Sequence, residues 1–173
     1  MSQTLNITTL AEEDIEPLIN LVNSAYRGES SKTGWTTEAD LLDGLRTNQH
    51  SVKALMQKTG SVIFSATDET GLMVGCVHLQ QNEQQLYLGM LTVAPDLQAR
   101  GIGKQLLEAA EKYGRKINCT FIIMTVIDIR HELIDWYKRK GYQSTGETRP
   151  FSTDPAFGIP KQRLRFIVLE KKL

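Results

Sequence analysis

Cysteine is scarce in this chain, and long apolar runs are absent. The two cysteines, Cys76 and Cys119, are far apart, and neither belongs to a Cys-x-x-Cys pair or lies beside a histidine. This pattern is typical of reduced, partly buried thiols in a cytosolic protein, and we expect no bound metal. The first ten residues lack the basic start and apolar run of a signal peptide, and no stretch approaches the roughly 18 apolar residues that span a bilayer. We therefore expect a cytoplasmic protein without a membrane partner.

An excess of charge of either sign is also lacking. Lys and Arg together number 20, as do Asp and Glu, so the formal net charge is zero. Such a balance leaves no electrostatic footprint for nucleic acid. The one short cationic run, Lys138-Arg139-Lys140, ends a predicted helix, where cations are favoured by the helix dipole alone. We expect no nucleic-acid partner, and 173 residues fit a single domain spanning 1–173.

The spacing of apolar residues predicts helices and strands in a mixed order. A helix over 11–27 precedes a polar loop at 28–34, and Thr36 or Thr37 can cap a second helix running to Leu45. Three runs separated by turns predict an antiparallel meander. The crossover through a helix at 103–116 then requires one parallel strand pair. The expected class is α/β, with a mixed, mostly antiparallel sheet flanked by helices. Its strands are predicted at 6–10, 61–67, 72–80, 84–93, 120–127, 142–147 and 163–169, and a further helix at 131–140.

The most informative segment runs from Gln98 to Lys104, where a predicted strand ends and a helix begins at two glycines. A helix N-terminus carries unpaired N–H groups and positive dipole potential, so it can hold a phosphate if backbone approaches closely. A Rossmann turn would need a third glycine where Leu106 stands. A P-loop would need glycine at Gln98 and a hydroxyl residue at Gln105. A glycine-containing helix start without a ligand remains an alternative for this segment alone.

Two motifs in this region resemble those of the GNAT N-acetyltransferase family. Residues 91–107 resemble its acetyl-CoA motif, Q/R-x-x-G-x-G/A after a strand reading L-x-V-x-P, with Gln98, Gly101 and Gly103 at the fixed positions. The segment Trp136-Tyr137-Lys138-Arg139-Lys140-Gly141-Tyr142 resembles its F-Y-x-x-x-G-F/Y element. The specific likeness covers residues 84–142, and the flanking elements follow the family's order more loosely. The resemblance implies a GNAT fold in which a splayed parallel strand pair holds the cofactor.

The resemblance also implies the site residues. Acetyl-CoA, as cosubstrate, would lie along one strand and on the turn, contacting Leu91, Thr92, Val93, Gln98, Ala99, Arg100, Gly101, Ile102, Gly103 and Lys104. Backbone N–H groups near 91–93 would stabilise the oxyanion. Tyr137 would act as general acid toward the departing thiolate, since a phenol pKa of about 10 is close to a thiol's of about 8.5.

The general base is less evident. Many members of the family carry an acidic residue near the position of Gly89, and this departure argues against a direct carboxylate base there. The remaining candidates are Glu29, Asp128, His131 and Glu132. Glu83 lies too far back along the chain, and we expect His78 to be satisfied locally in its strand. Removal of the proton through ordered water is an equal alternative.

The acceptor is expected between the first helical region and the last loop. These carry Tyr26, Arg27, Trp35 and Arg149 with the loop aromatics Phe151 and Phe157, and Arg130 projects nearby. Arginines with aromatics suit a small acceptor that bears a carboxylate, such as an amino acid. The predicted function is transfer of the acetyl group of acetyl-CoA to a primary amine, by direct attack in a ternary complex. The alternatives are a non-catalytic acyl-CoA-binding regulatory module and a protein or peptide N-acetyltransferase, while a longer acyl group and a monomer or homodimer stay open.

Overall fold

The fold is organised around one seven-stranded sheet. The computed structural model describes residues 3–152, 155 and 158–173. Within them every neighbouring strand pair of this sheet is antiparallel except β5–β6, which is parallel. The mixed, mostly antiparallel sheet predicted from the sequence is therefore confirmed. Its strands, in spatial order, are β1 (Asn6–Thr9), β3 (Ser61–Thr67), β4 (Met73–Asn82), β5 (Gln85–Val93), β6 (Phe121–Ile127), β9 (Arg165–Lys172) and β7 (Gln143–Pro150).

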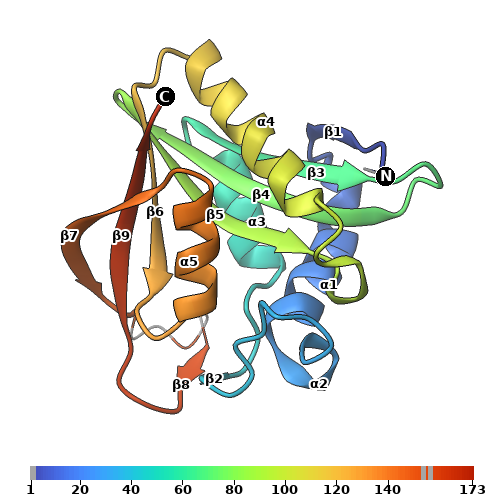
Figure 1. Cartoon of the computed structure of the whole chain (residues 1–173). Helices are drawn as coiled ribbons and strands as arrows, with labels where there is room; N and C mark the ends of the chain where they lie inside the picture. The colour runs from blue at the N-terminus through green and yellow to red at the C-terminus, as the bar shows by residue number, and fades with distance from the viewer. Residues whose placement is uncertain (1–2, 153–154, 156–157) are drawn as a thin grey trace.

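Helices cover both faces of the sheet (Figure 1). α4 (Ile102–Lys116) and α5 (His131–Arg139) lie on one face, and α1 (Ile15–Tyr26) and α3 (Gln49–Gln57) lie on the other. On α4 the apolar positions recur at three and four residues, and this stripe is buried against the sheet. The predicted helix over 11–27 begins instead with a 3₁₀ turn, η1 (Glu12–Asp14), which leaves Pro17 in the first turn of α1, where its missing N–H costs nothing.

The predicted helix over 36–45 is wrong. That stretch is mostly turn, and it contains a short strand, β2 (Leu42–Asp43), which pairs with β8 (Ile159–Pro160). Leu42 is buried with Ile127 and Leu164, so the apolar residues serve a small tertiary cluster rather than a helix face. A one-turn helix, α2 (Gly28–Ser31), also occupies part of the expected loop.

The sequence analysis missed α3. It begins after Asn48, whose side chain accepts a hydrogen bond from the Ser51 N–H at 2.9 Å and so caps the helix. Its interior contributes only one fully buried side chain, Val52, to the core. With so few buried positions, the periodic apolar signal is too weak to mark this helix.

The parallel pair β5–β6 separates along its length. The two strands pair only at Gln85–Phe121, Leu86–Ile122 and Tyr87–Ile123, although β5 runs on to Val93 and β6 to Ile127. A bulge lies beside the point of separation, because the β4–β5 register shifts between Cys76 and His78 and Met90 adopts a φ of 53°. The predicted splay is thus present, and it opens the middle of the sheet.

Candidate functional site

One edge of β5 faces the opening between the splayed strands. The Ala94 N–H donates to the Val74 carbonyl at 2.9 Å, so the antiparallel alternation turns the backbone groups of Leu91 and Val93 away from β4. Both carbonyl groups are bonded by side chains rather than by β4. The Tyr26 hydroxyl donates to the Leu91 carbonyl, and Gln98 Nε2 donates to the Val93 carbonyl at 3.2 Å. An extended ligand lying in the opening could therefore pair with this edge as an added strand.

The turn after β5 leads into the start of α4 through two left-handed residues. Ala99 has a φ of 66°, and Gly101, the N-cap of α4, has a φ of 82°. No described side chain caps the first turn of α4, so its leading N–H groups are directed outward. A Cβ atom added at Gly103 would lie 3.5 Å from Trp136 Cζ2 and 3.6 Å from Val93 Cγ2. A methyl group would therefore fit at Gly103 with ordinary contacts, whereas a longer side chain would enter the groove.

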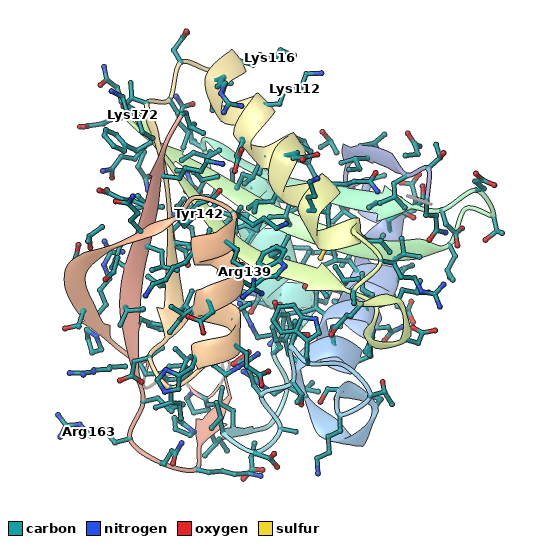
Figure 2. All side chains as sticks on the ribbon, viewed as in Figure 1. Lys112, Lys116, Arg139, Tyr142, Arg163 and Lys172 are labelled. Atoms are coloured by element: carbon teal, nitrogen blue, oxygen red, sulfur yellow. The ribbon has the colours of Figure 1, made fainter. Side chains whose placement is uncertain are left out.

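A groove of about 600 Å³ continues from this turn along α5. Its cations are Lys104 of α4 and Arg139 and Lys140 at the end of α5. Figure 2 labels Arg139 on α5. It also labels Lys112 and Lys116, which lie toward the C-terminal end of α4 and so away from the groove. The groove is lined by Trp35, Val93, Ala99, Gly101, Gly103, Lys104, Glu132, Asp135, Trp136, Arg139 and Lys140.

The predicted cofactor residues differ in what they present. Thr92 and Ile102 are almost fully buried, and Thr92 also pairs with Cys76 of β4, so neither side chain can meet a ligand. Arg100 is exposed at the turn but does not line the groove. Gln98 points back into the protein, where its Oε1 accepts from the Trp35 N–H at 2.8 Å. The turn thus offers backbone donors, with Lys104 as the charged side chain of the turn that lines the groove.

A second cavity, of about 280 Å³, lies within the splay itself. It brings together Tyr26, Arg27, Arg130 and Tyr137 from the predicted site. Trp35 lines the neighbouring groove instead, and its carbonyl accepts from Arg130 Nη2 at 3.3 Å. The cavity is lined by Tyr26, Arg27, Glu38, Arg46, Tyr87, Leu88, Gly89, Met90, Leu91, Met124, Thr125, Val126, Ile127, Arg130, Leu133, Tyr137, Phe151, Ser152 and Phe166.

The structure does not bring Arg149 to either hollow. Its side chain lies on the exposed edge strand β7, where its Nε is 2.8 Å from Glu147 Oε1. Proximity in the chain to the last loop suggested a contact with the acceptor that strand pairing does not allow. Phe151 does line the cavity, whereas Phe157 and the side chain of Glu29 lie outside the described residues.

The charges around the cavity are predominantly positive. Arg46 lies over the Tyr26 ring, 5.8 Å from its centroid, and joins Arg27 and Arg130 in the lining. Glu38 is the one carboxylate among the described lining residues, and its Oε2 is 3.8 Å from Arg27 Nη2. Burial lowers the pKa of Arg27, and Glu38 opposes that shift. The sequence analysis missed Arg46 and Glu38 as site residues because it assigned that stretch to a helix or left it unassigned.

Tyr137 lies at the α5 side of the cavity. Its ring packs edge-on against Trp136 and Tyr142, with centroid distances of 5.0 and 5.8 Å. Burial raises the pKa of the Tyr137 hydroxyl well above its usual range, and Tyr26 and Tyr87 add to the rise. Tyr137 lines the cavity, and the raised pKa keeps its hydroxyl protonated.

None of the described candidates for a base lies in the cavity. Asp128 Oδ2 accepts from Arg165 Nε at 2.8 Å, His131 is exposed, and Glu132 lines the groove. His78 is satisfied within its own sheet, as expected, because its Nε2 lies 2.8 Å from Ser61 Oγ. Glu83 lies at the far end of β5, in the turn that joins it to β4.

The described part of the chain contains no cluster of three or more His, Cys, Asp or Glu side chains arranged to hold a metal ion. None of its helices combines the length and the apolar character needed to cross a membrane.

Comparison with known proteins gives consistent matches. The family model described as "Acetyltransferase (GNAT) family" matches residues 17–142. No curated protein matches the chain. Among solved structures, the ribosomal-protein-S18-alanine N-acetyltransferase of Escherichia coli superposes with a TM-score of 0.71 at 17% identity, over 98% of this chain and 94% of that one.

Two other solved structures show the same fold at similar identity. A GNAT-family acetyltransferase from Staphylococcus aureus Mu50 superposes with a TM-score of 0.69 at 16% identity, over 98% of this chain and 99% of that one. The IAA acetyltransferase from Bacillus cereus gives a TM-score of 0.68 at 16% identity, over 98% and 100%.

Proposed function

The chain belongs to the acetyltransferase (GNAT) family of acyl-CoA-dependent N-acyltransferases, and from this we propose that it acetylates the primary amine of a small acceptor that bears a carboxylate. The observation that carries this proposal is the cavity in the splay. There an open strand edge, a protonated phenol and three guanidinium groups meet within about 280 Å³.

The residues at the groove fit acetyl-CoA. The diphosphate would be held by the outward N–H groups at the start of α4, with Gly103 giving room and Lys104 supplying charge. The pantetheine arm would pair with the backbone of Leu91 and Val93. When bound, the cofactor supplies an activated thioester. In this arrangement the reacting carbon would lie in the splay, between the faces of the sheet.

The acceptor would occupy the side of the cavity lined by Tyr26, Arg27 and Arg46. Arginine binds carboxylates through paired N–H donors, and the excess of guanidinium groups over Glu38 leaves positive potential for an anionic group. Arg27 is engaged by Glu38 and Arg130 donates to Trp35, so we assign the carboxylate chiefly to Arg46.

The transfer would proceed by direct attack. The neutral amine attacks the thioester carbon as the C–N bond forms and the C–S bond breaks. Backbone N–H groups at the bulge of β5 would stabilise the charge on the carbonyl oxygen. Tyr137 would then give its proton to the departing sulfur, and the proton that the attacking nitrogen loses as the amide forms would pass through water and restore the phenol. A thiolate that is desolvated in the same cavity would be destabilised as the phenolate is, which keeps this proton transfer feasible despite the raised pKa of Tyr137.

The first test is calorimetric titration with acetyl-CoA, comparing the wild type with Gly103→Glu. We expect saturable binding to the wild type and its loss in the variant, because a carboxylate would fill the groove beside phosphate charge. Gly103→Ala, whose Cβ would make only ordinary contacts, is the matched control and should bind. Absence of binding to the wild type would refute the proposal.

The acceptor class is tested by thiol release from acetyl-CoA with free amino acids and their C-terminal amides. We expect the wild type to turn over the free acids faster than the amides. In Arg46→Gln the KM for the free acids should rise, whereas the KM for the amides should not. Equal turnover of acids and amides would overturn the assignment of a carboxylate subsite. Binding of acetyl-CoA without transfer to any amine would favour a regulatory module instead.

A further inference from the structure

Two hydroxyl groups join the strands just beyond the point where β5 and β6 separate. Tyr87 and Ile123 form the last register pair, and from there the Tyr87 side chain crosses the gap, so that its hydroxyl lies 3.2 Å from Thr125 Oγ1. Both residues line the cavity. The pair therefore sits at the apex of the splay, where the sheet first opens.

The Tyr87 ring also takes the space beside Gly89. A Cβ added at Gly89 would meet Tyr87 Cε1 at 3.0 Å and the Tyr87 hydroxyl at 3.5 Å. A side chain at Gly89 would thus crowd the ring, which leans along the strand toward the open end. The polar group presented to the cavity at this level of β5 is accordingly the phenol of Tyr87.

The two hydroxyls lie on the opposite face of the sheet from Tyr137. Leu86 and Leu88 are buried in the cluster that packs under α4 and α5, so the alternation along β5 turns Tyr87 to the α1 face. Met124 and Val126 belong to the same cluster, which turns Thr125 to the α1 face as well. Tyr137 approaches the splay from α5. A reacting carbon in the opening would have hydroxyls on one side and the proton donor on the other.

We propose that the Tyr87–Thr125 pair positions the nucleophilic amine of the acceptor. Either hydroxyl can donate across this 3.2 Å contact; in the proposed arrangement the Tyr87 O–H would donate to Thr125 Oγ1, and a phenol lone pair would accept one N–H of the neutral amine. The nitrogen lone pair is then free to point at the thioester carbon. The opposite polarity, with Tyr87 donating to the amine, would occupy the attacking lone pair. Thr125 thus acts through Tyr87 by holding the phenol proton away from the nucleophile.

This inference rests on the proposed function and adds to it a contact that is independent of the carboxylate. Arg46 would anchor the acceptor's anionic end, while the hydroxyl pair orients its amine. Methylamine separates the two, because it has an amine but no anionic group. Acetyl transfer to methylamine should therefore report the contribution of Tyr87 without that of the anionic contact.

The experiment compares Tyr87→Phe, Thr125→Val and Thr125→Ser with the wild type, using methylamine and the free amino acid that the wild type acetylates fastest. We expect kcat/KM for both amines to fall about 3- to 10-fold in Tyr87→Phe and Thr125→Val, the size of one neutral hydrogen bond. Thr125→Ser, which keeps the hydroxyl, should restore the wild-type value. The dissociation constant for acetyl-CoA should stay unchanged in all three variants.

Other results would overturn the proposal. Wild-type kcat/KM in Tyr87→Phe would show that the hydroxyl touches no reacting group. If only the acetyl-CoA dissociation constant changed, or if Tyr87→Ala merely admitted propionyl- and butyryl-CoA, the side chain would shape the acyl pocket instead. Tyr113→Phe, on α4 against Phe64, is the matched control and should behave as wild type. A wild type that transfers to no amine would refute the proposed function, a result distinct from unchanged variants of an active enzyme.

Discussion

The chemistry of Tyr137 is set by its surroundings as much as by its identity. A free phenol would titrate near pH 10, close to a thiol. Within the protein, burial raises the pKa of Tyr137, and the neighbouring Tyr26 and Tyr87 act in the same direction. The side chain therefore keeps its proton throughout the range in which an amine acceptor becomes neutral. Its proposed role is that of a donor only.

Removing the Tyr137 hydroxyl should affect the chemical step alone. In Tyr137→Phe we expect kcat to fall about 10²- to 10⁴-fold, the usual contribution of a general acid, with the acetyl-CoA dissociation constant unchanged. In the wild type, kcat/KM should rise with pH as the acceptor amine loses its proton, and should show no decline from Tyr137 up to about pH 10. Steady-state kinetics across pH measures both, and a kcat within twofold of wild type in the variant would contradict the proposed role.

His78 differs from Tyr137, because its titration affects the stability of the fold rather than the proposed reaction. Burial lowers its pKa from 6.5 to about 4, and the positive charges of Lys58 and Arg46 contribute. Above pH 6.5 the imidazole is neutral in both the folded and the unfolded chain. Between pH 6.5 and 4 the unfolded chain takes up a proton that the folded chain does not, so folding stability is lost as the pH falls.

This linkage predicts a measurable slope. The free energy of unfolding should decrease from pH 6.5 to 4 with a His78 contribution of at most about 1.4 kcal/mol per pH unit. Urea unfolding of His78→Gln should show a correspondingly shallower pH dependence than the wild type. His50→Gln, which changes an exposed histidine of α3, is the matched control and should keep the wild-type slope. Parallel pH dependences for His78→Gln and the wild type would exclude this linkage.

At the scale of elements, one side chain connects the cofactor turn to the segment before β2. Gln98 Oε1 accepts from the Trp35 N–H at 2.8 Å, and its Nε2 donates to Thr36 Oγ1 at 2.7 Å. The segment lies so close that a Cβ at Gly34 would be 2.5 Å from Gln98 Oε1. Arg130 holds the same segment by donating to the Trp35 carbonyl. The segment at residues 34–36 therefore contacts residues of both the groove and the cavity.

A double-mutant cycle tests this connection. Gly34→Ala should lower stability by about 1–3 kcal/mol through overpacking, and should weaken acetyl-CoA binding as the turn shifts. Adding Gln98→Ala should recover part of the stability lost in Gly34→Ala, because it removes the atoms that clash. Thermal unfolding and calorimetric titration of both single variants and the double variant measure the coupling. Strictly additive effects would mean that the two residues are not in contact.

At the scale of the whole molecule, strands from both ends of the chain share one sheet. β1 lies near the N-terminus and β9 near the C-terminus, and each pairs within the same seven-stranded sheet (Figure 1). The splay interrupts that sheet at its centre, where a cavity of about 280 Å³ lies between strands that no longer pair. We propose that residues 1–173 form one domain in which the bound cofactor completes the sheet.

Cofactor binding should accordingly stabilise the entire fold. At 100 times its dissociation constant, acetyl-CoA should add about 2.7 kcal/mol to the free energy of unfolding. For a chain of this size that corresponds to a rise in Tm of roughly 5–10 °C. Differential scanning calorimetry with and without acetyl-CoA measures it. Gly103→Glu should show no shift, and a ligand-independent Tm in the wild type would mean that the cofactor does not bind the folded chain.

The sequence was sufficient for features that local patterns encode. The strands at 61–67 and 84–93, the helices over 103–116 and 131–140, and the parallel crossover follow from apolar spacing and turn residues, and the structure confirms them to within two residues. The glycines of the turn and the family motifs are contiguous in the chain, so they could also be recognised from the sequence. The short strands β2 and β8 were not, because each is stabilised by a partner more than a hundred residues away.

Only the tertiary structure decided which side chains line the cavity. Arg46, Glu38, Tyr87 and Thr125 come from separate segments, and nothing in their own neighbourhoods marks them as cavity residues. Arg149 carries the charge expected of a binding residue, yet pairing of β7 with β9 holds it on the exposed edge. A side chain's type and local period are properties of the sequence, whereas its neighbours across a splayed sheet depend on long-range strand pairing and burial.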